Sequence, residues 1–174
     1  MKFLIAGFGG QGILFAGKFL AYIGLYGEKE VSWLPSYGPE MRGGTANCSV
    51  ILADSPIGSP IVDKPEVLMV MNDPSLVKFE QSVEPGGLIF YDSSLVSAPT
   101  RSDVTAVGVP ATGLAEENGM HGLANMILTG KLLDGVQLCP LSQIEDTLKK
   151  MIPERKKDML DINIRALKLG REYK

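Results

Sequence analysis

Two kinds of hydrophobic pattern divide the chain. Apolar runs of strand length lie at residues 2–6 and 67–71. Such runs are typical of strands that are buried on both faces, as in a parallel sheet. Two further strands are predicted at residues 88–92 and 104–109. Residues 45–52 instead alternate between apolar and polar side chains, which predicts an antiparallel or edge strand. The face predicted to be buried carries Ala46, Cys48, Val50 and Leu52.

Helical patterns lie between the predicted strands. Pro74 directly after Asp73 predicts a helix start, because proline fits the first helical position. Further helices are predicted at residues 12–25, 123–133, 141–152 and 157–173, and a short strand at 30–34. Strands that alternate with helices predict an α/β fold of the Rossmann-like type. We expect a single domain over residues 1–174, with a mostly parallel sheet, flanking helices and an antiparallel edge strand.

Composition narrows the class of protein. The 174 residues are 45% hydrophobic, which is enough for a core that needs neither disulfides nor a metal. The net charge is −3 with 17 lysines and arginines and no strong basic cluster, so a nucleic-acid partner is not expected. No apolar segment approaches the roughly 18 residues that span a bilayer. Cys48 and Cys139 are isolated in the sequence, so we expect neither an iron–sulfur cluster nor a zinc site on this chain, and a cytoplasmic location.

The stretch GFGGQG begins at Gly7 and joins the first predicted strand to the first predicted helix. In a dinucleotide-binding loop of this spacing, Gly7 permits the tight turn, Gly9 leaves room for a phosphate and Gly12 lets the helix pack closely. Backbone amides at the start of a helix favour an anion. We therefore predict that this loop binds a ligand, with Gly10 and with Gln11, whose side-chain amide can donate to an anion or to a partner chain.

A complete dinucleotide site also needs an acidic residue at the end of the second strand, where it holds the ribose. Glu28 and Glu30 lie at the start of that predicted strand, and its end carries Pro35, Ser36 and Tyr37 instead. The loop is therefore only weak evidence for NAD. A tight turn that merely packs the helix explains it about equally well.

A second loop, PSYGPEMRGG, combines several chemically useful groups. Tyr37 offers a ring and a hydroxyl, Glu40 a carboxylate, and Arg42 a planar guanidinium that suits phosphate or carboxylate. Ligands of open α/β sheets bind beyond the carboxyl ends of the strands, so this loop and GFGGQG should share one edge of the sheet. We predict Tyr37, Arg42 and Gly43 as binding residues. The alternative is a surface loop in which Glu40 and Arg42 pair with each other.

Other polar residues are weaker candidates. His121 has no cysteine or second histidine nearby in the sequence, so it is interpreted as a cap or surface residue. Asp92 follows a strand and could meet a ribose, but a turn of this kind usually satisfies its own backbone. Cys48 is interpreted as inert core, and Asn125 as either a buried amide or a helix contact. No catalytic and no metal-binding residue is predicted, since nucleophile elbow, Walker lysine and carboxylate pair are all missing from the sequence.

These motifs, in this order, carry a family resemblance. GFGGQG, PSYGPEMRGG, NCSVIL with SPIGSP, and PEVLMVMN resemble the gamma subunit of 2-oxoacid:ferredoxin (acceptor) oxidoreductases, over the chain to roughly residue 150. The 2-oxoglutarate and 2-oxoisovalerate enzymes are the most similar, and the pyruvate enzyme is also similar. The resemblance matches the family's two loops at Gly9, Gly10, Gln11 and Gly12, and at Tyr37, Gly38, Pro39, Glu40, Arg42 and Gly43. Lys131 stands where a small residue is expected.

The resemblance implies an enzyme built from several chains, which converts a 2-oxoacid to acyl-CoA, carbon dioxide and reduced ferredoxin. It implies that thiamine diphosphate and magnesium belong to alpha and beta subunits, and iron–sulfur clusters to the beta or a ferredoxin-like delta subunit. This chain would be a non-catalytic, Rossmann-like subunit that packs on the alpha and beta pair and helps to bind coenzyme A.

Two alternatives stay open at the level of the sequence. One is a free-standing Rossmann-like oxidoreductase or nucleotide-binding module with its own NAD or FAD, although the missing second-strand carboxylate argues against it. The other is a purely structural subunit whose glycine loop binds nothing.

Overall fold

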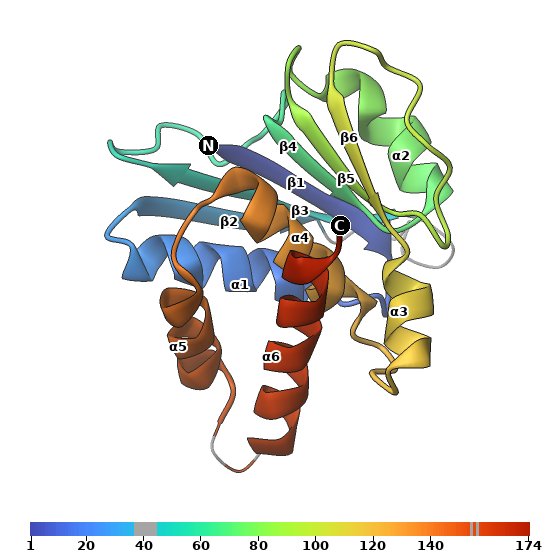
Figure 1. The fold of residues 1–174 in the computed structure, drawn as a ribbon. Helices are drawn as coiled ribbons and strands as arrows, with labels where there is room; N and C mark the ends of the chain where they lie inside the picture. Colours follow the sequence, from blue (N-terminus) through green and yellow to red (C-terminus); the bar gives the residue numbers. More distant parts are fainter. Residues whose placement is uncertain (37–44, 154, 156) are drawn as a thin grey trace.

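The fold is known from a computed structural model, which describes residues 1–36, 45–153, 155 and 157–174. The described residues form one six-stranded sheet in the order β2-β3-β1-β4-β5-β6, with helices on both faces (Figure 1). The first half comprises β1 (Lys2–Phe8), α1 (Ile13–Tyr26), β2 (Glu30–Ser36), β3 (Thr45–Ala53), β4 (Val67–Val70), α2 (Asp73–Phe79) and the 3₁₀ turn η2 (Glu80–Ser82). The second half comprises β5 (Leu88–Asp92), β6 (Thr105–Val109), α3 (Ala111–Glu117), α4 (Ala124–Val136), α5 (Leu141–Met151) and α6 (Lys157–Glu172). The predicted α/β fold is thereby confirmed, and β1 and β4 are buried as predicted, whereas β6 is an edge strand in which only Val109 is fully buried.

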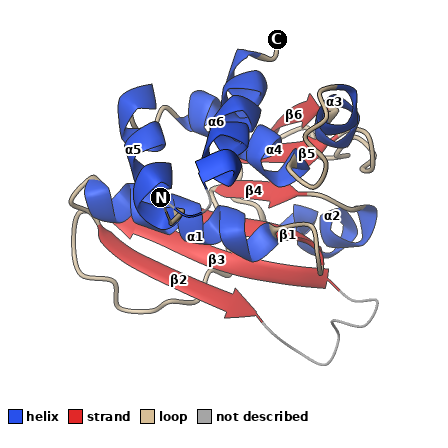
Figure 2. Cartoon of the chain, turned by 90° about the horizontal axis from the view of Figure 1, so that it is seen from below, coloured by secondary structure: helices blue, strands red, loops and turns tan. Residues whose placement is uncertain are grey.

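The core is divided unequally between the two faces of the sheet. Alternate residues of β1 show the division, because Phe3 and Ile5 join the larger cluster while Leu4 and Ala6 join the smaller one. The larger cluster lies under α1, α4, α5 and α6, and the smaller one under α2 (Figures 1 and 2). Both clusters consist of residues removed from water, which is the main favourable contribution to folding.

The position of β3 corrects one expectation. β3 pairs antiparallel with both β1 and β2, so its predicted antiparallel direction is confirmed, but it lies inside the sheet and β2 forms the edge. Its alternating pattern has another cause than an edge position. One face of β3 packs under α1, where Cys48 and Val50 are buried. Over the other face, carrying Asn47 and Ser49, Figure 2 shows no helix among the described residues. The alternating pattern of β3 therefore indicates a strand that is covered by a helix on one face only.

Helices α4 and α6 cross at two glycines. A Cβ atom on Gly130 would overlap the Leu167 carbonyl, and one on Gly170 would overlap the Ile127 carbonyl, so the two backbones touch. Lys131, the next residue, instead donates from Nζ to the Tyr173 carbonyl at 2.7 Å. The small residue that α4 contributes to this crossing is thus Gly130, one position before Lys131.

Candidate functional site

The glycine loop leaves β1 at Phe8 and enters α1 at Ile13, as the strand–loop–helix pattern predicts. Gly10 has φ 95° and Gly12 has φ 74°, a left-handed backbone that glycine adopts without steric cost. The first hydrogen bond of α1 runs from Ala16 N to the Gly12 carbonyl at 3.0 Å. The amides of residues 12–15 therefore precede the helical ladder of α1 and have no partner within it.

Gly7 has a different role from the expected one. It lies within β1 and not in the tight turn, which falls at Gly9 and Gly10. A Cβ atom on Gly7 would lie 2.6 Å from Gln11 Oε1 and 2.7 Å from Ile13 Cδ1. The absence of a side chain at this position is what lets the loop fold back against β1.

Gln11 fastens this returning loop. Its Oε1 accepts a hydrogen bond from Phe8 N at 2.6 Å, and its Nε2 donates to the Met71 carbonyl at 2.9 Å. Met71 directly follows β4, so one side chain joins the carboxyl ends of two neighbouring parallel strands. The Gln11 amide thus holds the loop in place, and any ligand would meet the backbone that it holds.

A cavity of about 410 Å³ opens beside the loop, and we call it the glycine-loop cavity. Gly10, Gln11 and Met71 line one side, and Thr112, Glu116, His121, Gly122 and Asn125 are among the residues that line the rest. His121 is exposed there, as its interpretation as a surface residue predicts. Among the described residues, no lysine or arginine lines this cavity, and Glu116 places a carboxylate in its wall.

Asp92 at the end of β5 is a structural carboxylate. It is fully buried, and it accepts hydrogen bonds from Ser94 N at 3.1 Å, Thr112 N at 3.1 Å and Thr112 Oγ1 at 2.5 Å. The interpretation that this turn satisfies its own backbone is confirmed, and Thr112 extends it to the first turn of α3. The sequence analysis missed α3, because its short ATGLAEE segment resembles a polar loop.

Asn125 proves to be both a buried amide and a helix contact. It is 3% exposed, and its Nδ2 donates to the Gly12 carbonyl at 3.1 Å, across 113 residues of sequence. A Cβ atom on Gly12 would overlap this Nδ2. Gly12 therefore serves two needs, its left-handed backbone and the close approach of α4.

The sheet order bears directly on the NAD question. In a dinucleotide-binding unit the second strand is the neighbour of the first, but here β3 separates β2 from β1. At the edge that carries the glycine loop, Phe8 pairs with Thr45. Glu30 pairs with Ala53 and so lies at the opposite edge of the sheet. The prediction that Glu30 lies at the wrong edge is confirmed.

The second loop lies outside the described residues, and with it Tyr37, Glu40, Arg42 and Gly43. Its two anchors are described: Ser36 pairs with Asn47, and Thr45 pairs with Phe8 at the end of β1. Both anchors therefore lie at the same edge as the glycine loop. The binding roles of Tyr37, Arg42 and Gly43 remain predictions.

Cysteine and acidic groups do not assemble into a metal site among the described residues. Burial raises the pKa of the Cys48 thiol to about 12, although Trp33 and Gly17 donate to it, and this confirms its interpretation as inert core. Burial also raises the pKa of Cys139. Within the same described ranges, the helices are all too short or too polar to cross a membrane.

Comparisons with known proteins match this architecture. The sequence model of the family described as pyruvate ferredoxin/flavodoxin oxidoreductase matches residues 2–173. The chain is 36% identical over 170 residues to ketoisovalerate oxidoreductase subunit VorA of Methanothermobacter marburgensis. The aligned region covers 97% of this chain but only 35% of VorA. It therefore spans about a third of the length of VorA.

Shorter relatives match over most of their length. The chain is 34% identical over 154 residues to 2-oxoglutarate synthase subunit KorC of Methanocaldococcus jannaschii, which covers 86% of this chain and 82% of KorC. The structure of 2-oxoglutarate:ferredoxin oxidoreductase from Magnetococcus marinus superposes with a TM-score of 0.87 at 21% identity, over 98% of this chain and 30% of that one. That structure contains 2-oxoglutarate, coenzyme A and succinyl-CoA. At 21% identity, the superposition shows that the two chains share a fold.

Proposed function

The chain belongs to the pyruvate ferredoxin/flavodoxin oxidoreductase family, and from this premise we propose that it is the gamma subunit of a cytoplasmic 2-oxoacid:ferredoxin oxidoreductase. The enzyme would convert a 2-oxoacid and coenzyme A to acyl-CoA, carbon dioxide and reduced ferredoxin. Relatives named for ketoisovalerate and for 2-oxoglutarate support a branched-chain 2-oxoacid or 2-oxoglutarate as substrate. Substrate choice would lie mainly on the other subunits.

The proposed role of this chain is to dock on the alpha and beta subunits and to contact coenzyme A. When bound, thiamine diphosphate supplies the decarboxylation chemistry of such enzymes, and we assign it, magnesium and the iron–sulfur clusters to other chains, including a ferredoxin-like delta subunit. The donor set here supports that assignment, since Cys48 is buried with a high pKa and no metal-binding group forms among the described residues. The proposed contribution of this chain is the set of backbone amides at the glycine loop.

One observation carries the proposed contact with coenzyme A. Residues 12–15, whose amides precede the hydrogen bonds of α1, line a cavity of about 260 Å³ together with Gly9 and Gly10, and Gln11 holds the loop by two hydrogen bonds. Amides at a helix start are suited to phosphate groups, which coenzyme A carries. Arg42, on the second loop, is proposed to add a guanidinium to the same phosphates.

A pair of variants at Gly10 tests this contact. Gly10→Asp places a carboxylate beside the free amides and is expected to raise the dissociation constant of the assembled enzyme for coenzyme A about tenfold, or about 1.4 kcal/mol. Gly10→Asn has the same size and tolerates the same backbone, and it is expected to bind within about twofold of the unmodified enzyme. Calorimetric titration measures both, and equal affinities of the two variants would contradict the contact.

The glycine loop also keeps a second candidate function testable. A free-standing oxidoreductase would bind NAD or FAD through the same amides. Titration of the purified chain with NAD and FAD, in the same buffer as coenzyme A, separates the two functions. Micromolar binding of either dinucleotide would replace the proposed subunit role. The separation of β2 from β1 favours the proposal.

A further inference from the structure

β2 is one of the two edge strands of the sheet, and the direction of its backbone groups follows from its neighbours. Leu52 N donates to the Met1 carbonyl at 2.9 Å, and Met1 N donates to the Leu52 carbonyl at 2.6 Å. The backbone groups of Leu52 therefore face β1. Successive residues of an antiparallel strand face opposite sides, so the backbone groups of Ile51 and Ser49 face β2.

The register of β2 and β3 then assigns the backbone of β2. Ser32 pairs with Ile51 and Leu34 pairs with Ser49, so both of these β2 residues direct their backbone groups to β3. The alternate residues of β2 face the opposite way, and they are Val31, Trp33 and Pro35. No strand formed by described residues lies beyond them. We call the outward-facing backbone of these three residues the β2 edge.

The β2 edge lacks most of the features with which proteins block an exposed strand, such as a bulge or charged side chains. Pairing with β3 is continuous from Glu30 to Ser36, which excludes a bulge within β2. Residues 31–36 contain no charged side chain. Trp33 and Leu34 are instead 37% and 41% exposed, and only Pro35 lacks an outward N–H. Such a strand is suited to pair with another strand.

A groove of about 610 Å³ lies beside the β2 edge, and we call it the β2 groove. It opens on the face of β2 and β3 over which Figure 2 shows no helix among the described residues. Leu34, Ile61 and Phe79 give it apolar walls, and Ile61 is 61% exposed. Asp63 is the one charged residue among the described residues that line it. A segment with apolar side chains and a basic group complements this lining.

A second copy of this chain is a poor match for the groove. Its two edge strands, β2 and β6, contain no lysine or arginine, so neither would bring a counter-charge to Asp63. A pair between β2 and β6 would also join two different edges, and such contacts propagate into filaments unless their rotation closes a ring. The chemistry of the groove therefore favours a different chain.

We propose that β2 accepts a strand from another subunit of the same enzyme, and that this strand carries apolar side chains and a lysine or arginine that pairs with Asp63. The inference rests on the proposed function, under which this chain is one subunit of several. In strand addition, main-chain hydrogen bonds supply affinity and pockets for alternate side chains supply specificity. The β2 edge provides the first and the β2 groove the second.

Amide hydrogen exchange, resolved by residue, tests the strand addition by comparing the purified chain with the assembled enzyme. The amides of Ser32 and Leu34 face β3 and should exchange slowly in both. Those of Val31 and Trp33 should exchange at least about tenfold more slowly in the assembled enzyme, because the added strand supplies their acceptors. Protection that appears at alternate residues distinguishes strand pairing from simple burial of the surface.

Val31→Pro tests the edge by mutation. Proline removes an N–H that faces outward and leaves the bonds to β3 in place. The dissociation constant for the other subunits should rise about tenfold relative to Val31→Ala, which also shortens the side chain but keeps the N–H. Dilution of the assembled enzyme, followed by size-exclusion chromatography, measures both variants. If Val31→Pro does not fold, the exchange measurement on the unmodified enzyme decides.

Asp63→Lys tests the charge of the partner strand. It places like charges together and should raise the same dissociation constant about tenfold, with a larger effect at low salt. Asp63→Asn only removes the attraction and should raise it about threefold. Asp161→Lys is the control, because it makes the same change of charge at an exposed position of α6. Equal assembly of Asp63→Lys and Asp161→Lys would overturn the basic partner.

The remaining outcomes separate this inference from the proposed function. If the enzyme assembles while the amides of Val31 and Trp33 stay fast, the proposed function stands and strand addition at β2 is wrong. If the free chain dimerises and these amides become slow as its concentration rises, a second copy occupies the edge and the assigned partner is wrong. If the chain does not assemble with subunits that oxidise a 2-oxoacid, the proposed function itself fails.

Discussion

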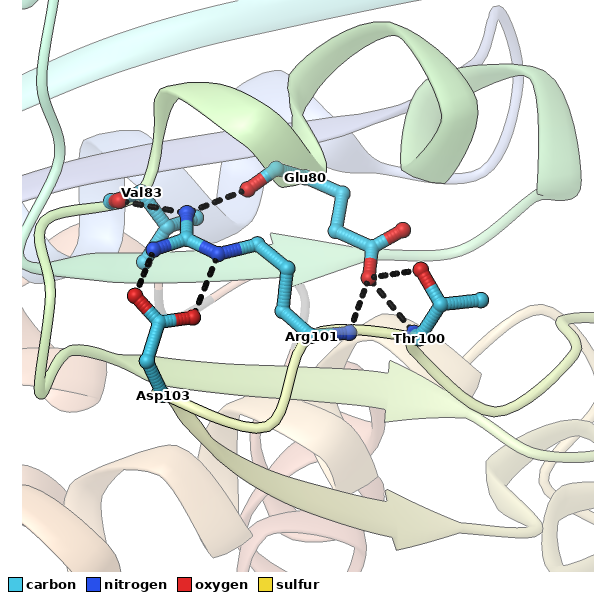
Figure 3. A network of polar contacts seen from close by, with 5 residues as sticks. All are labelled: Glu80, Val83, Thr100, Arg101 and Asp103. Carbon is cyan, nitrogen blue, oxygen red and sulfur yellow. Dashed lines mark hydrogen bonds and ion pairs between the residues drawn. The ribbon is translucent and has the colours of Figure 1, made fainter.

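The two edges of the parallel sheet use their polar groups in opposite ways. At the amino edge, before β5 and β6, Arg101 is surrounded by acceptors (Figure 3). Its guanidinium donates to both oxygens of Asp103, at 2.8 and 2.6 Å, and to the carbonyls of Glu80 and Val83, at 3.0 and 2.6 Å. At the carboxyl edge, the amides of residues 12–15 have no partner within α1, and the buried Asn125 Oδ1 has none among the described residues.

Glu80 completes the network at the amino edge. Its carboxylate accepts from Thr100 N at 2.5 Å, Thr100 Oγ1 at 3.0 Å and Arg101 N at 2.9 Å, and the residue is 7% exposed. We call these four residues, Glu80, Thr100, Arg101 and Asp103, the Arg101 network. A buried carboxylate beside an arginine resembles an active site, but here Glu80 Oε1 accepts three hydrogen bonds and the Arg101 guanidinium donates four, all within the chain. Satisfied groups stabilise a fold, and unsatisfied ones are available for binding.

The largest expected effect on this contrast comes from Glu80→Ala. The substitution leaves two backbone amides and a hydroxyl without their acceptor, and it is expected to lower the free energy of unfolding by about 3 kcal/mol. Coenzyme A binding by the assembled enzyme should not change, because the Arg101 network lies at the opposite edge. Chemical denaturation followed by circular dichroism measures the loss. Glu80→Gln keeps an acceptor oxygen and should lose less, and a loss of ligand affinity would show that the two edges are coupled.

Gly12→Ala should affect both stability and binding at the carboxyl edge. The methyl group strains a left-handed backbone and overlaps the Asn125 amide, so unfolding should become easier by about 2 kcal/mol. Affinity for coenzyme A should fall as well, because Gly12 is the first of the residues whose amides are proposed to contact its phosphates. Gly58→Ala is the control, since a Cβ atom there meets nothing within 4 Å. Stability loss with unchanged affinity would remove Gly12 from the binding site.

The smallest effect is a pH dependence at the amino edge. The hydrogen bond from Arg101, and then its charge, hold the pKa of Asp103 below the ordinary value of 3.8. A lowered carboxyl pKa contributes stability above the unfolded value, and this contribution is lost as the pH falls through the folded value. Thermal unfolding between pH 5 and about 2 should therefore show an acid-dependent decrease that Asp103→Asn reduces. An identical acid profile in the variant would show that the exposed pair contributes nothing measurable.

Local features of the fold were predictable from the sequence. The buried strands β1 and β4 follow from apolar runs, and α1 follows from the helical pattern at residues 12–25. Two glycines of α1 lie close to other side chains, Gly17 to Cys48 and Gly24 to Leu52. The missed helix α3 is short, and its first turn is held by a hydrogen bond from Thr112 to Asp92, twenty residues away.

The candidate site was predictable in position but not in detail. Gly10 and Gly12 could be identified because a left-handed backbone next to a helix is a local requirement that glycine meets. The roles of Gln11 and Asn125 could not, since their partners Met71 and Gly12 lie 60 and 113 residues away. No periodicity along the chain records a contact of that range.

The sequence by itself therefore determined which segments are strands and helices, where the chain turns sharply, and that the chain has its family's motifs. These properties depend on neighbouring residues and on burial, which leave a repeating pattern. Only the tertiary structure decided that β3 separates β1 from β2, and which polar groups find partners: Glu80 and Arg101 do, whereas Asn125 Oδ1 has none among the described residues. Whether a hydrogen-bonding group finds a partner depends on which elements meet in space, and the packing of the whole chain decides that.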